Sequence, residues 1–137
     1  MNMQKILIIT AINGLVGIFW QILTTGFLFH SLYNFEPIEI WKPLFEFPNL
    51  IHYFWLIIIA FALTYIFNLL PKPLAESKLK QGLIFGLIVW GISALSLVSL
   101  LMFTIINLWF LLYLLINLLV IFLIQGVIIS YLEDAPF

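Results

Sequence analysis

Two histidines, His30 and His52, are the side chains of this chain best suited to bind a haem or a transition metal. One closes a long apolar segment and the other opens the next. Two neutral imidazoles can ligate a b-type haem, or share a metal with a loop carboxylate such as Glu36. However, the pair lacks the i, i+4 spacing of two ligands on one helix, and a histidine at a membrane interface is more often simply amphipathic. We therefore expect no cofactor and no metal. If a haem or a metal is bound, His30 and His52 are the candidate ligands.

Hydroxyl nucleophiles gather in the third apolar segment, as Ser93, Ser96 and Ser99. Intramembrane proteolysis needs a serine with a histidine or lysine, a pair of aspartates, or an HExxH metal helix. None of these combinations occurs in that segment. Ser130 and Asp134 are expected to belong to a frayed tail. The residue types and their spacing therefore argue against an enzyme.

Ionisable side chains are missing from the interior of every apolar segment. In membrane proteins such groups mark proton relays, ion pathways and voltage sensors. Small multidrug-type antiporters are similar in size and helix number, but they depend on a glutamate embedded in the first span. The first segment here carries Asn13 and Gln21 in place of a carboxylate, so this resemblance fails.

The composition indicates a membrane protein. Hydrophobic residues make up 65% of the chain and charged residues 8%, against about 25% charged residues in soluble domains. Residues 81–132 contain no charged side chain. As one helix they would extend roughly 78 Å, whereas the hydrocarbon core is about 30 Å thick, so they must cross twice. A net charge of −1 offers no basic surface for nucleic acid, and the absence of cysteine excludes disulfides and thiolate metal sites.

The uncharged runs 6–35 and 47–71 supply one further crossing each. The first run is longer than a secretory h-region, and we interpret it as an uncleaved membrane helix. The predicted fold class is all-α, a polytopic integral membrane protein whose four transmembrane helices form a compact bundle in one domain over 1–137. The predicted spans are about 6–29, 49–70, 80–103 and 107–132, with an outer loop at 30–48 and a cytoplasmic loop at 71–79.

The lysines predict the orientation of these spans. Positive residues collect in cytoplasmic loops, and acidic residues count for little in this rule. With four crossings, one side carries four lysines, namely Lys5, Lys72, Lys78 and Lys80, and the outer loop carries Lys42 alone. We therefore predict a multi-pass protein of the cell membrane with both termini in the cytoplasm.

The outer loop and its borders are rich in aromatic residues and prolines, including Tyr33, Trp41 and Trp55. Trp and Tyr favour the headgroup level, where the ring body is apolar and its tip can hydrogen-bond. We favour an interfacial belt. The alternative is a docking or ligand surface whose acidic residues face an external partner.

Small and uncharged polar side chains recur at helical spacing within the predicted spans. Small residues let helix backbones approach closely, and amides hydrogen-bond across helices. We expect these residues to face inward and pack the bundle; the alternative is a narrow polar path or a groove for a lipid headgroup. The candidate packing residues are Gly82, Gly86, Ser93 and Ser96, the first two forming a GxxxG motif, and the candidate polar lining is Asn13, Gln21, Thr64, Asn68, Asn117 and Gln125.

Two classes of function are compatible with these features. The first is an accessory or structural membrane subunit or scaffold, whose partners are the lipid bilayer and other membrane proteins or further copies of itself. The alternative is transport or binding of a lipid, quinone or uncharged small molecule through the polar helix faces. A haem-carrying electron-transfer protein is a third, more distant reading.

Overall fold

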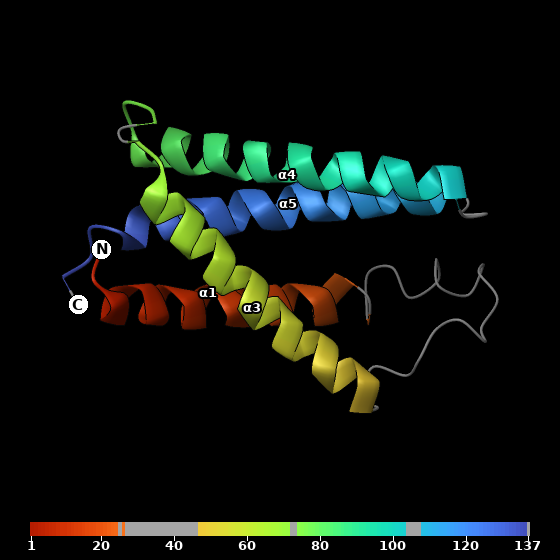
Figure 1. Cartoon of the computed structure of the whole chain (residues 1–137), viewed down its shortest axis with the longest axis horizontal. Helices are drawn as coiled ribbons and strands as arrows, with labels where there is room; N and C mark the ends of the chain where they lie inside the picture. Colours follow the sequence, from red (N-terminus) through yellow and green to blue (C-terminus); the bar gives the residue numbers. More distant parts are fainter. Residues whose placement is uncertain (25, 27–46, 72–73, 104–107, 137) are drawn as a thin grey trace. The chain divides into compact units, whose positions relative to one another are not determined.

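A computed structural model describes residues 1–24, 26, 47–71, 74–103 and 108–136, and these residues form helices and no strands (Figure 1). The helices are α1 (Met3–Leu23), α3 (Phe47–Leu69), α4 (Lys78–Phe103) and α5 (Leu108–Leu132). The predicted all-α class is confirmed for this part of the chain. The segments long and apolar enough to cross a membrane are Met3–Leu23, Lys78–Leu97 and Leu108–Leu132, whereas the apolar stretch of α3, Tyr53–Leu69, is shorter.

Local capping explains why two helices begin earlier than their predicted spans. The Asn2 side chain accepts a hydrogen bond from the backbone N–H of Lys5 at 2.9 Å, which starts α1 at Met3. The Ser77 hydroxyl accepts from the N–H of Lys80 at 3.3 Å and starts α4 at Lys78. Pro48 lies in the first turn of α3, where a missing N–H costs no helical hydrogen bond. The residues of the predicted outer loop up to position 46 lie outside the described part.

The chain divides into two compact units, Met1–Asn68 and Leu69–Phe137. In the first unit, α1 and α3 run in opposite directions and cross at an angle (Figure 1). The amino group of Met1 donates to the Asn68 side chain at 2.7 Å. A methyl group built on Gly14 would lie 3.3 Å from the Ile57 side chain. Contacts therefore join the start of α1 to the end of α3, and the middle of α1 to the middle of α3.

In the second unit, α4 and α5 lie side by side and antiparallel (Figure 1), in close contact at three glycines. A methyl group on Gly82 would lie 2.5 Å from the Val127 Cα atom, and one on Gly86 would lie 2.5 Å from the Phe122 carbonyl oxygen. On the opposite helix, a methyl group on Gly126 would collide with the carbonyl oxygen of Gly82. The obstacles are backbone atoms, which cannot rotate away as a side chain can. Glycine is therefore required at all three positions.

Hydrogen bonds between the helices flank this glycine contact. The Ser130 hydroxyl donates to the Lys78 carbonyl oxygen at 2.9 Å. The Trp90 indole N–H donates to the Leu115 carbonyl oxygen, also at 2.9 Å. Together with the glycines, these bonds fix the register of α4 on α5 from Lys78 to Trp90.

We expect Gly86→Ala to lower the free energy of unfolding in detergent by about 1–3 kcal/mol, the usual range for overpacking, and to lower the melting temperature accordingly. The new methyl group has no space beside the Phe122 carbonyl. Gly91→Ala is the matched control, because a methyl group there meets nothing within 4 Å. That change should leave stability unchanged or raise it by about 0.5–1 kcal/mol through helix propensity. Equal losses in both variants would contradict the proposed backbone contact.

Candidate functional site

The two candidate metal or haem ligands cannot be placed. His30 lies outside the described residues, and although His52 belongs to α3, its side chain is not described. Among the described residues, no three His, Asp or Glu side chains lie close enough together to hold a metal ion. The histidine site therefore stays a sequence-based hypothesis.

The polar residues of α1 lie mostly on its buried face. Asn13 and Thr24 are fully buried, and Gln21 is half-buried. The Thr24 hydroxyl donates to the Trp20 carbonyl oxygen at 2.8 Å. A further buried polar residue of α1, absent from the predicted lining, is Thr10, which is 5% exposed and whose hydroxyl has no hydrogen-bond partner among the described residues. Thr10 lies one turn before Asn13, so the spacing alone could have added it to the polar lining.

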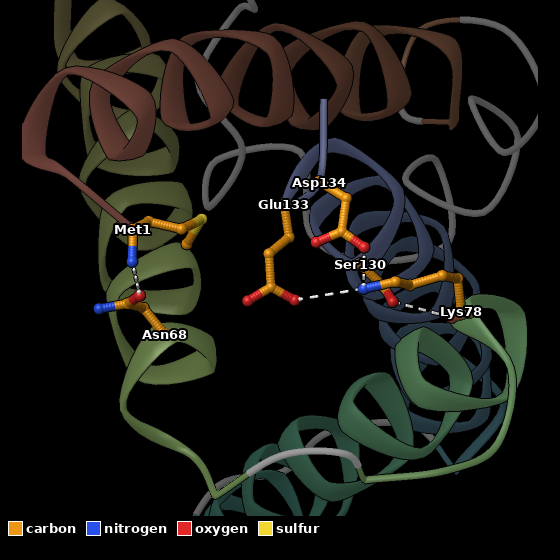
Figure 2. Close-up of polar contacts among 6 residues, drawn as sticks. All are labelled: Met1, Asn68, Lys78, Ser130, Glu133 and Asp134. Atoms are coloured by element: carbon orange, nitrogen blue, oxygen red, sulfur yellow. Dashed lines mark hydrogen bonds and ion pairs between the residues drawn. The ribbon is translucent and has the colours of Figure 1, made fainter. Parts of the chain in front are cut away.

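The two candidate lining residues of α3 have local partners. Thr64 is fully buried, and its hydroxyl donates to the Ala60 carbonyl oxygen at 2.8 Å. Asn68, at the end of α3, accepts a hydrogen bond from the Met1 amino group through its side-chain oxygen (Figure 2). Neither geometry requires a ligand, because the helix and the nearby amino group supply these bonds.

In the second unit, the candidate packing residues differ from one another. Gly82 and Gly86 lie against α5. Ser93 is half-buried and donates to the Val89 carbonyl oxygen of its own helix at 2.9 Å, whereas Ser96 is exposed. Of the two lining candidates on α5, Gln125 is buried and Asn117 is half-buried.

The expectation that Ser130 and Asp134 form a frayed tail is wrong. Ser130 belongs to α5, is fully buried and bonds to Lys78 of α4. Figure 2 shows the Lys78 ammonium group beside two carboxylates: the Asp134 oxygen lies 2.6 Å from Nζ and the Glu133 oxygen 3.7 Å from it. These four residues form what we call the end cluster. The signal was present in the sequence, since Gly126 and Ser130 are spaced four apart and complement the GxxxG motif of α4.

Helix dipoles explain why the charges of the end cluster occur as a group. Lys78 begins α4 and the two carboxylates follow α5, so each charge is unfavourable at the end of its own helix. The antiparallel pairing brings the start of α4 beside the end of α5, where the Ser130 bond joins them. There each charge faces an opposite charge and an oppositely polarised helix end. The end cluster therefore stabilises the pairing of α4 with α5.

No known protein family, curated protein or solved structure matches the chain. The chemistry of the described residues is thus the basis for assigning a role. Within the end cluster the Ser130 hydroxyl donates to a carbonyl oxygen, and a nucleophile would need to face a base instead. The arrangement is suited to holding two helices together.

We predict that Ser130→Ala destabilises the protein by about 1 kcal/mol, because it removes a hydrogen bond at a buried side chain. Asp134→Ala should cost less, about 0.5 kcal/mol or below, since Asp134 is 66% exposed and Lys78 36% exposed. Chemical denaturation in detergent at low and high salt distinguishes the two: the Asp134 effect should vanish at high salt and the Ser130 effect should persist. The exposed Ser99 provides the control Ser99→Ala. A Ser130→Ala effect as small as that of the control would contradict the stabilising role of the end cluster.

Proposed function

We propose that this protein is an integral membrane protein of four transmembrane helices, with both termini in the cytoplasm, that acts as an accessory or structural subunit or scaffold. Its helices would pack within the bilayer against each other and against a membrane partner. The observation that carries the proposal is the glycine contact of α4 with α5. It is a close approach of two apolar helices that carry no charge from residue 81 to residue 103 and from 108 to 132, the mode of association that small residues permit in membranes.

The hydroxyl groups of the helices support this proposal. Thr24, Thr64 and Ser93 each donate to the carbonyl oxygen four residues earlier in the same helix. In a membrane, where water cannot supply a partner, this back-bonding satisfies a hydroxyl without any second component. Three polar groups that would otherwise be candidates for transport or catalysis therefore have a structural partner.

Large apolar side chains on the outer faces of the helices also support a membrane location. Exposed examples occur on every helix: Leu15 and Phe19 on α1, Phe54 and Trp55 on α3, Ile92 and Leu95 on α4, and Leu108 and Trp109 on α5. In water such surfaces are aggregation liabilities. Lipid tails or an apolar partner helix would cover them without cost.

The fourth span and the orientation are the finer parts of the proposal. The 23 residues of α3 would extend roughly 34 Å, enough for a hydrocarbon core of about 30 Å. Lys5, Lys78 and Lys80 all lie in the first turns of α1 and α4. Four crossings would place these lysines on one side of the membrane, and the positive-inside rule assigns that side to the cytoplasm.

A binding or transport role for a lipid, quinone or uncharged small molecule is the second candidate, and Thr10 favours it. Its hydroxyl is buried without a hydrogen-bond partner among the described residues, although hydroxyls elsewhere in the protein bond to their own helix. Asn13 lies one turn further, fully buried and at the middle of α1. A polar group of a bound molecule would satisfy the Thr10 hydroxyl.

Thr10→Val and Gln125→Leu separate the two candidates when melting temperature and co-purified lipid are measured together. Under the packing proposal, Thr10→Val leaves stability unchanged or raises it, because it replaces an unsatisfied hydroxyl by a methyl group of similar shape. Gln125→Leu should lower the free energy of unfolding by about 0.6 kcal/mol, the mean contribution of an interhelical hydrogen bond in a membrane. Neither change should alter the retained lipid, and wild-type protein should co-elute with a polypeptide partner or self-associate. Loss of a retained molecule at unchanged melting temperature would contradict the scaffold role and support binding.

A further inference from the structure

One face of α5 differs in composition from the rest of the helix. Residues three or four apart lie on the same face of a helix. We call one such series the outer stripe; its members are Trp109, Leu112, Ile116, Val120, Leu123, Val127 and Tyr131. Every member is exposed or half-buried, and none is buried. The two aromatic residues at its ends are among the more exposed, Trp109 at 73% and Tyr131 at 56%.

The outer stripe lacks the residues that pack membrane helices together. It contains no glycine, alanine, serine or threonine, although small and polar residues are enriched where such helices meet. Gly126 and Ser130, the small residues through which α5 contacts α4, lie outside the stripe, and so do the amides Asn117 and Gln125. The composition of the outer stripe therefore suits lipid tails better than another helix.

The ends of the outer stripe are spaced like the two surfaces of a bilayer. At 1.5 Å per residue, Trp109 and Tyr131 are separated by roughly 33 Å along the helix, and the hydrocarbon core is about 30 Å thick. Trp and Tyr favour the headgroup level on both sides of a membrane. The five residues of the stripe between them are all aliphatic, as the hydrocarbon core requires.

The charges of the second unit agree with this placement. Tyr131 lies two residues before Glu133, at the charged end of the α4–α5 pair. From Leu108 to Leu132, α5 carries no charge, which complements a hydrocarbon layer. The charged residues that the structure describes in this unit all lie before α4, in its first turn, or after α5; they are Glu76, Lys78, Lys80, Glu133 and Asp134.

We propose that the outer stripe is a lipid-facing surface of the α4–α5 pair, with Trp109 at the headgroups of one leaflet and Tyr131 at those of the other. The inference rests on the proposed membrane location and deepens it, because it names lipid as the partner of this face and sets the depth of each residue. Val120 is equally far from the two aromatic residues, roughly 16 Å along the helix from each, and lies at the bilayer midplane. A protein partner of the scaffold docks on another face.

Spin-label accessibility in phosphatidylcholine vesicles tests the proposal, because the chain has no native cysteine. Oxygen concentrates in the lipid core and a nickel chelate stays in water, so the ratio of their collision rates with a nitroxide reports its depth. Ile121→Cys is the matched control, since Ile121 lies next to Val120 at nearly the same depth but is 8% exposed. The labelled variants are Leu112→Cys, Ile116→Cys, Val120→Cys, Leu123→Cys and Val127→Cys.

We expect oxygen to collide more often with every stripe label than with the Ile121 label, and the depth to be greatest at Val120 and to fall towards both ends. Stripe labels as shielded from both reagents as the Ile121 label would overturn the proposal, because protein would then cover the stripe. A maximum displaced from Val120 by a helical turn or more would overturn the placement of Trp109 and Tyr131. Frequent nickel collisions along the whole stripe would instead contradict the membrane location itself.

A second measurement tests the same face in intact cells, where a protein partner is present if one exists. Photoreactive benzoylphenylalanine in place of Ile116 or Leu123 should form no adduct with a polypeptide after irradiation. Both positions lie on the outer stripe, one on each side of Val120. An adduct with a second copy of the chain or with another polypeptide at either position would overturn the proposal.

Discussion

A peptide group in the hydrocarbon core of a bilayer has no water to bond to, and leaving one unsatisfied costs several kcal/mol. In the account proposed here, this constraint governs the whole chain. It explains why every described element is a helix, and why the hydroxyls of Thr24, Thr64 and Ser93 bond to carbonyl oxygens of their own helices. Among the described residues, the charged side chains, which are costlier still to bury, lie in the first turns of α1 and α4, before α4 and after α5.

Because apolar side chains gain nothing by leaving lipid for one another, two membrane helices need another source of affinity. The α4–α5 pair has two. Three glycines allow the backbones to approach until no methyl group fits between them, which increases van der Waals contact. The end cluster then pairs charges that are unfavourable on their own helices. The first unit shares only the close approach at a glycine: Gly14 of α1 faces Ile57 of α3.

The sequence was sufficient to predict the helices and most of their limits, because apolar runs without charges admit few other structures. It was less informative about contacts. The GxxxG motif predicted close packing near the start of α4, but which helix it meets depends on a partner motif, Gly126 with Ser130, that lies about forty residues away in the chain. The Lys78–Asp134 ion pair likewise joins residues that no local pattern connects. The spacing of Thr10 before Asn13 could have placed it in the polar lining, but a threonine in a membrane helix usually bonds to its own backbone, and that the Thr10 hydroxyl lacks a partner among the described residues is visible only in the structure.

Cysteine accessibility reports the number and the direction of the membrane crossings, and single cysteines can be introduced without background because the chain has no native cysteine. Glu76→Cys probes the loop before α4; Glu76 is exposed, and it is preferable to Ser77, which caps α4. Asn34→Cys probes the predicted outer loop. With a membrane-impermeant maleimide, Asn34→Cys should react in intact cells and Glu76→Cys only after the membrane is permeabilised. The reverse pattern would contradict the orientation, and labelling of both positions in intact cells would contradict the four crossings.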